Sequence, residues 1–242
     1  MNWDQIVEAI LPSIVKIETP QGHGTGFLCF CNEAKNVFGI ATANHVVEHA
    51  DKWHEPIRIH HFPSNSTVLL KEPERVIYVN PFMDSALIVA SFEQLQLPQE
   101  PIPLLPTDDR LPLGMEVGWL GYPAIDEENT LCFFSGTVSA WNDFRKAYLI
   151  DGVAINGISG GPVVYFAPEA GVQIIGTITA YRANRNTGET LPGLSIAQDV
   201  SHFHDTIARI KSFQEATVKK KELEQPNNDV PAGPLENKTT KA

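Results

Sequence analysis

A serine lies among glycines in the stretch from Asn156 to Val164, NGISGGPVV. Glycines 157, 160 and 161 surround Ser159, and an apolar β-branched run follows. Glycine is placed where the backbone takes a positive φ or closely approaches another group. Such a turn exposes the hydroxyl and gathers backbone N–H groups, which are the nucleophile and the oxyanion donors that acyl transfer needs. The alternative interpretation is a tight turn between two strands that has no chemical role.

A nucleophilic serine needs a base, and the base needs an acid that orients it. His45 follows an apolar strand and a set of small residues, and it precedes a short predicted helix. Asp84 comes directly before a predicted buried strand. Each has an ordinary structural interpretation, as a half-buried polar residue and as a turn aspartate. His23, in the glycine-rich stretch 21–26, is a weaker candidate for a role in the same site.

The composition excludes several classes of function. The chain has 242 residues, 43% of them hydrophobic, and a formal net charge of -11. That charge disfavours nucleic acid and anionic membranes as partners, because phosphate binding depends on lysine and arginine. No segment has the length of a membrane span, and the N-terminus lacks the features of a signal peptide. The odd set Cys29, Cys31 and Cys132 predicts reduced, mostly buried thiols without a metal role, which favours a cytoplasmic protein.

The elements that must position these residues are mostly strands. About a dozen short strands alternate with turn signals, and the longer helical patterns lie near the two ends, which predicts an all-β fold built as paired barrels or a sandwich. The proline-rich residues 97–113 are predicted to connect lobes at about 13–96 and 114–197. The glycines of residues 21–26 predict a turn that leads into a strand at 27–31. A helix is predicted at 198–213, followed by a disordered tail at 214–242.

Several short motifs occur in an order that resembles a known family. They are GTGF at Gly24–Phe27, TANHVV at Thr42–Val47, DSALI at Asp84–Ile88, VGWLGYP at Val117–Pro123, and GISGGP at Gly157–Pro162. The sequence is similar to the chymotrypsin-like serine peptidases, most closely to the HtrA/DegP-like peptidase domain without a PDZ domain. The resemblance covers roughly residues 5–213 and implies one peptidase domain at 1–213. Its fold would be two six-stranded antiparallel β-barrels with short terminal helices.

The resemblance also implies a role for each matching residue. Ser159 matches the nucleophile, His45 the general base and acid, and Asp84 the residue that orients the histidine. The backbone N–H groups of Gly157 and Ser159 match the oxyanion hole. Thr179 matches a hydroxyl that supports the aspartate and begins the substrate-binding segment. The family acts on a protein or peptide substrate without a cofactor.

Two departures from the family pattern affect regulation. Ile158 stands where digestive members have an aspartate that pairs with a newly cut N-terminus. Without that salt bridge, the oxyanion loop could be ordered by substrate or by a regulatory protein partner. No PDZ-like domain is expected after residue 213, so the sequence leaves the regulation of activity open. A catalytically silent or partner-activated binding module on the same fold is therefore an alternative to a serine endopeptidase, and an esterase is a third.

The position six residues before the nucleophile suggests the substrate preference. It is acidic in trypsin-like members and is Val153 here. A basic side chain in that pocket would leave its charge unpaired, so cleavage is expected after apolar or small residues. Ala180 and Tyr181 are expected to line the mouth of the pocket.

Overall fold

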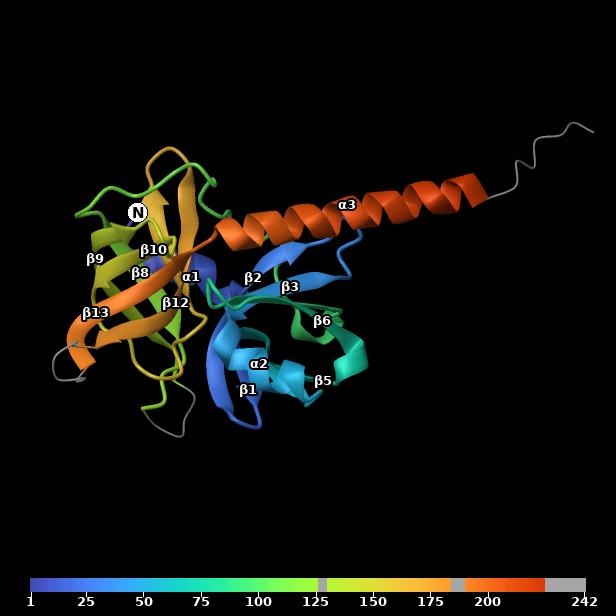
Figure 1. Ribbon diagram of the computed structural model, residues 1–242, viewed down its shortest axis with the longest axis horizontal. Coiled ribbons are helices and arrows are strands. Elements are labelled where there is room, and N and C mark those ends of the chain that lie inside the picture. Colours follow the sequence, from blue (N-terminus) through green and yellow to red (C-terminus); the bar gives the residue numbers. More distant parts are fainter. Residues whose placement is uncertain (126–129, 184–189, 225–242) are drawn as a thin grey trace, which may run out of the picture. The chain divides into compact units, whose positions relative to one another are not determined.

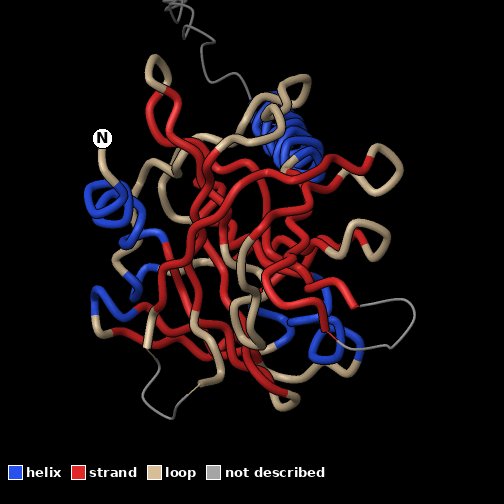
Figure 2. Tube along the Cα trace, turned by 90° about the vertical axis from the view of Figure 1, so that its left-hand side faces the viewer, coloured by secondary structure: helices blue, strands red, loops and turns tan. Residues whose placement is uncertain are grey.

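The computed structural model describes residues 1–125, 130–183 and 190–224. The chain divides into two compact units, residues 1–207 and 208–242. Strands are the main secondary structure of the first unit, and its first two helices are short and peripheral (Figure 2). All of the predicted site residues belong to this first unit.

The N-terminal half of the first unit is one antiparallel sheet with the strand order β5-β4-β1-β2-β3-β7-β6. Its elements are α1 (Trp3–Ile10), β1 (Ile14–Thr19), β2 (Gly22–Cys31), β3 (Phe38–Ala43), α2 (Asn44–Lys52), β4 (Ile57–His61), β5 (Ser66–Leu70), β6 (Arg75–Asn80) and β7 (Ser85–Ala90). Short 3-10 turns occupy Leu11–Ser13, Phe62–Ser64, Glu72–Glu74 and Glu93–Leu95.

The second half is a closed six-stranded barrel with the order β10-β13-β12-β11-β8-β9 (Figure 1). Its strands are β8 (Glu116–Gly121), β9 (Cys132–Asn142), β10 (Ala147–Asp151), β11 (Pro162–Ala167), β12 (Gly171–Ala183) and β13 (Thr190–Asp199). The connector from the first sheet docks on this barrel, where Leu104 forms a parallel bridge with Ile174.

The all-β, chymotrypsin-like double-barrel fold predicted from the sequence is confirmed. The barrel has the expected six strands, whereas the described N-terminal sheet has seven. The seventh arises because the 3-10 turn Glu72–Glu74 separates β5 from β6, and these two strands form opposite ends of the sheet order.

The core of the N-terminal sheet fixes the helix that carries His45. Branched aliphatic side chains from six strands are buried together, among them Val15, Ile17, Leu28, Ile40, Ile57, Ile59, Leu70 and Ile88. Helix α2 contributes Val47 and Ala50 to the same cluster. Burying these residues ties the first turn of α2 to the sheet, because apolar area removed from water is the main stabilising term.

The glycine-rich stretch at residues 21–26 is not the turn that the sequence predicts. Residues 22–26 belong to β2 and pair with β1, from Thr19 opposite Gly22 to Val15 opposite Gly26. A Cβ added at Gly26 would lie 2.7 Å from the Ile17 side chain. The glycines here permit close packing rather than a change of direction, which is the other use of a residue without a side chain.

The C-terminal helix α3 spans Ser201–Glu224 and continues past residue 213, where the sequence predicts its end. The rest of the predicted tail, residues 225–242, lies outside the described residues. Among the described helices, none has both the length and the apolar character needed to cross a bilayer. All three cysteines are unpaired, although only Cys29 is buried.

Arg75 provides a test of how helix α2 is attached to the N-terminal sheet. Its buried guanidinium donates to the carbonyls of Leu70 (2.7 Å), Ala50 (3.2 Å) and Glu55 (2.6 Å), which joins β6 to the end of α2. We expect Arg75→Met to lower the free energy of unfolding by about 3 kcal/mol, because three carbonyls lose a charged donor. The control Arg58→Met removes an exposed pair with Glu18 (3.4 Å) and should cost less than about 1 kcal/mol. Equal urea midpoints for the two variants would contradict this account.

Candidate active site

Strand register brings His45 and Asp84 together. Strands β3 and β7 pair antiparallel, and the last pair of that ladder is Ala43 opposite Ser85. The contact continues beyond the ladder, because the N–H of Asn44, just after β3, donates to the carbonyl of Asp84, just before β7, at 3.0 Å. The two positions are 39 residues apart in sequence, yet the end of one ladder makes them neighbours.

The Asp84 carboxylate binds His45 at two points. One oxygen, Oδ1, accepts the backbone N–H of His45 at 3.0 Å, and Oδ2 lies 2.8 Å from the ring atom Nδ1. A carboxylate oxygen only accepts, so the proton of this contact belongs to Nδ1 and the second nitrogen, Nε2, is left as an acceptor. Asp84 itself has a left-handed backbone (φ 45°), which aspartate tolerates better than most residues. The histidine is therefore held in one tautomer and one orientation.

Ser159 lies in the loop between β10 and β11, and this loop is fastened on both sides. The Ser159 carbonyl accepts the Thr25 N–H from β2 at 2.8 Å. The Gly160 N–H donates to the Ile178 carbonyl of β12 at 2.7 Å. Gly160 has φ +87°, and a Cβ there would collide with the Thr25 carbonyl. Both the positive φ and the lack of space require glycine after the serine.

The serine loop packs against the residues on either side of His45. A Cβ at Gly24 would lie 2.6 Å from the Val46 side chain and 3.0 Å from the Ser159 carbonyl. A Cβ at Gly160 would lie 3.0 Å from the backbone nitrogen of Ala43. These distances place the Ser159 backbone near the strand end that carries His45 and Asp84. Within the described part of the chain the Ser159 hydroxyl forms no hydrogen bond to His45, and such contacts commonly tighten only when substrate binds.

The backbone around Gly157 leaves two donors available. Gly157 has φ +94°, and the preceding carbonyl, of Asn156, accepts the Ala124 N–H at 2.7 Å. The Asn156 carbonyl is therefore held toward the loop after β8, on the side opposite the Gly157 N–H of the same peptide. Among the described residues, the N–H groups of Gly157 and Ser159 donate to no other group. Free, adjacent N–H groups next to a nucleophile are what an oxyanion hole requires.

Strand β2 supplies contacts to this loop that sequence reasoning missed or ranked low. The Thr25 hydroxyl donates to the Gly157 carbonyl and accepts the Tyr122 N–H, both at 2.9 Å. His23 Nε2 lies 3.1 Å from the Tyr122 carbonyl. Thr25 carried no chemical signal in the sequence, and only its place in the GTGF motif could have indicated it.

The residues predicted to bind substrate come from two parts of the barrel, the segment after β10 and strand β12. Val153 is 47% exposed, and its carbonyl accepts the indole N–H of the buried Trp119 at 3.2 Å. Thr179 is buried on β12 and makes no hydrogen bond to Asp84 within the described residues. Ala180 is exposed, and the side chain of Tyr181 lies outside the described residues.

Two exposed aromatic side chains meet beside Asp84. Phe82, two residues before Asp84, is 62% exposed, and Phe144, in the β9–β10 turn, is 78% exposed. Their ring centroids are 5.6 Å apart in an edge-on arrangement. The pair brings one ring from the N-terminal sheet against one from the barrel, and no sequence pattern indicated it.

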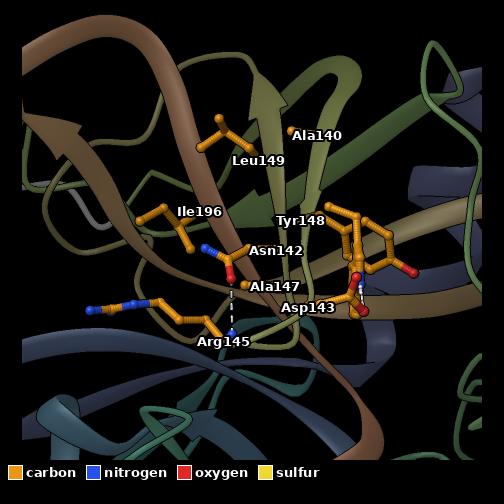
Figure 3. Close-up of a pocket in the computed structure, with 9 residues that line it drawn as sticks. Ala140, Asn142, Asp143, Arg145, Ala147, Tyr148, Leu149 and Ile196 are labelled. Atoms are coloured by element: carbon orange, nitrogen blue, oxygen red, sulfur yellow. Dashed lines mark hydrogen bonds between the residues drawn. The ribbon is translucent and has the colours of Figure 1, made fainter.

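A hollow of about 330 Å³ lies elsewhere, on β9, β10 and β13 (Figure 3). Its lining includes Trp141, Tyr148 and Ile196, and the Asn142 side chain there accepts the Arg145 N–H at 3.0 Å. None of the residues predicted for the site contributes to it. The predicted chemistry therefore belongs to the strand ends and loops around His45 rather than to this hollow.

The fit around Gly160 gives a test of the site geometry. We expect Gly160→Ala to destabilise the protein by more than about 3 kcal/mol, because an added Cβ meets fixed backbone as well as an unfavourable φ. Gly171→Ala is the control, since Gly171 has φ +78° with nothing within 4 Å, and only the conformational cost of about 1–2 kcal/mol applies. Thermal unfolding of both variants measures the difference. A Gly160→Ala protein as stable as Gly171→Ala would show that the loop is not packed as described.

Comparison with known proteins agrees with this architecture. The model of the family described as "Trypsin-like peptidase domain" matches residues 24–168. No curated protein sequence matches the chain. Among solved structures, an inactive form of the Rv3671c protease of M. tuberculosis H37Rv has 19% identity and a TM-score of 0.57, covering 86% of this chain and 91% of that one. A serine endoprotease from Yersinia pestis has 19% identity and a TM-score of 0.61, covering 86% of this chain and 66% of that one.

At these identities the solved structures support the fold alone, whereas the family model spans more than half of the sequence and includes all three predicted residues. The chain belongs to the trypsin-like peptidase domain family.

Proposed function

We propose that this chain is a serine endopeptidase in which Ser159 attacks the substrate carbonyl, His45 moves the proton and Asp84 orients the histidine. The observation that carries the proposal is the two-point contact between Asp84 and His45, with the Ser159 loop packed against the same strand end. A carboxylate that only supported a helix start would have no need to bind the ring nitrogen as well. The substrate is a protein or peptide.

The chemistry follows from the tautomer. With Nδ1 protonated toward Asp84, Nε2 can accept the Ser159 proton as the hydroxyl oxygen bonds to the carbonyl carbon. The protonated imidazole then gives that proton to the leaving amine, and an acyl-enzyme remains. Water repeats the sequence on the ester, and the carboxylate stabilises the positive ring in both halves.

The oxyanion of each tetrahedral intermediate would be bound by the free N–H groups of Gly157 and Ser159. Each such donor contributes on the order of 10²–10³ in rate in enzymes of this type. The free donors support an active site over the alternative of a silent binding module. The described residues show no hydrogen bond between Ser159 and His45, which either state allows before substrate binds, and covalent labelling distinguishes the two.

The preference for apolar or small residues stays part of the proposal. Val153 offers no charge to a basic side chain, and Ala180 on β12 is small and exposed. The exposed pair Phe82 and Phe144 adds apolar surface beside the site. Cytoplasmic residence is proposed as well, and the three unpaired cysteines support it.

The first test is removal of the nucleophile. Ser159→Ala should lower kcat for peptide hydrolysis by about 10⁶, because the three residues act as one unit. A fluorophosphonate probe should label the wild-type protein, and both Ser159→Ala and His45→Ala should abolish labelling. Ser139→Ala, at an exposed serine of β9, serves as the control and should react as wild type does. Labelling that survives in His45→Ala would argue against an assembled site, and hydrolysis of esters but not peptides would favour the esterase.

The second test concerns specificity. A peptide library should be cleaved after Ala, Val or Leu at least about 10-fold faster than after Lys or Arg, because an unpaired charge in the pocket is costly. Val153→Asp should narrow or reverse that ratio, and the exposed substitution Val76→Asp should leave it unchanged. Preferential cleavage after Lys or Arg by the wild-type protein would refute the assignment.

A further inference from the structure

The loop that would form the oxyanion hole is held by a strand of the other sheet. The Thr25 hydroxyl of β2 joins two separate segments of the barrel, since it donates to the Gly157 carbonyl and accepts the Tyr122 N–H. These partners lie 132 and 97 residues from Thr25 in sequence. Both hydrogen bonds are buried, so loss of the hydroxyl would leave a buried carbonyl and a buried N–H without partners.

His23, two residues before Thr25 in β2, contacts the same barrel residue, Tyr122. Its Nε2 lies 3.1 Å from the Tyr122 carbonyl, and a carbonyl only accepts, so this nitrogen carries the proton. A Cβ placed on Gly157 would lie 2.6 Å from Nε2 and would collide with the Tyr122 carbonyl. The ring is thus packed directly against the backbone that carries one of the two free N–H groups.

The other side of the loop is held by packing instead of charge. Ile158 is fully buried, and a Cβ at Gly121 would lie 2.8 Å from its Cα. An aspartate at residue 158 would need a buried cation, and none of the described contacts supplies one. The turn is completed by the Ile158 N–H, which donates to the Ile155 carbonyl at 3.2 Å.

We infer that Thr25 and His23 are positioning residues that hold the oxyanion loop in its working conformation, in place of an ion pair from a cleaved N-terminus. This inference rests on the proposed function. Turning the peptide between Asn156 and Gly157 would withdraw the Gly157 N–H from the site. It would also break the bond from Ala124 to the Asn156 carbonyl. The bond from Thr25 to the Gly157 carbonyl fixes the next peptide plane and so limits that rotation. The loop is therefore ordered by docking of the two sheets, without a processing step or a partner.

The test compares three threonine variants of the full chain. Thr25→Val removes the hydroxyl at constant shape and should lower kcat about 10- to 100-fold with KM nearly unchanged, because the oxyanion is present only after attack. Thr25→Ser keeps the hydroxyl and should retain kcat within about threefold. Thr19→Val is the matched control, since the Thr19 hydroxyl also bonds a backbone carbonyl, that of Gly22, in the neighbouring strand. Wild-type kcat in a folded Thr25→Val protein would overturn the inference.

Hydrogen exchange gives a readout that does not depend on activity. Peptides that contain the amides of Ala124 and Ile158 should exchange about 10- to 100-fold faster in Thr25→Val than in wild type, Thr25→Ser or Thr19→Val. If the variants show this exchange pattern but the wild-type protein hydrolyses no peptide, the proposed function fails and the positioning role stands. If it hydrolyses peptides and exchange does not respond to Thr25, the positioning role fails alone.

A second variant covers the case in which Thr25→Val does not fold. His23→Phe keeps a ring of similar size without the donor to Tyr122, and it should fold with kcat lowered about 10-fold and faster exchange at Ala124. His23→Gln can restore a donor and should recover part of both losses. Unchanged kcat and unchanged exchange in His23→Phe would show that His23 does not position the oxyanion loop.

Discussion

The pairing of β3 with β7 is the constraint on which the site depends. Because the ladder ends at Ala43 and Ser85, the first residues beyond it are Asn44 and Asp84, and a backbone hydrogen bond joins them. The carboxylate then reaches both the backbone and the ring of His45. A register slip of one residue would turn these side chains to opposite faces of the sheet. Every residue of β3 and all but one of β7 are buried, so such a slip would require both faces of these strands to repack.

The second requirement is that two sheets meet without side chains in the way. Gly24 and Gly160 lie at the contact between the serine loop and the strand end, where a single added carbon would displace the backbone. Glycine loses more conformational entropy on folding than any other residue, so its use here exchanges some stability for close packing. The Thr25 hydroxyl then satisfies polar groups from two segments of the barrel.

The loop beside Ser159 illustrates how one position can be stabilised by different physics. Ile158 replaces a possible charge with buried apolar area, and Gly121 makes room for it. The polar groups of the same loop are then satisfied by neutral hydrogen bonds to Ala124 and Thr25. Buried ion pairs carry a large desolvation cost, and apolar packing with neutral hydrogen bonds avoids it.

The sequence by itself determined the class of fold and the identities of the candidate residues. Alternating apolar positions predicted the strands, and the motifs around His45, Asp84 and Ser159 are local, so each could be recognised within about six residues. Only the tertiary structure decided that residues 22–26 form a strand, because glycine patterns are the same for a turn and for a crowded sheet. It also decided the place of Thr25, whose partners lie about a hundred residues away, and of the Phe82–Phe144 pair. Contacts of that kind arise from the docking of two sheets, which leaves no period or spacing in the sequence.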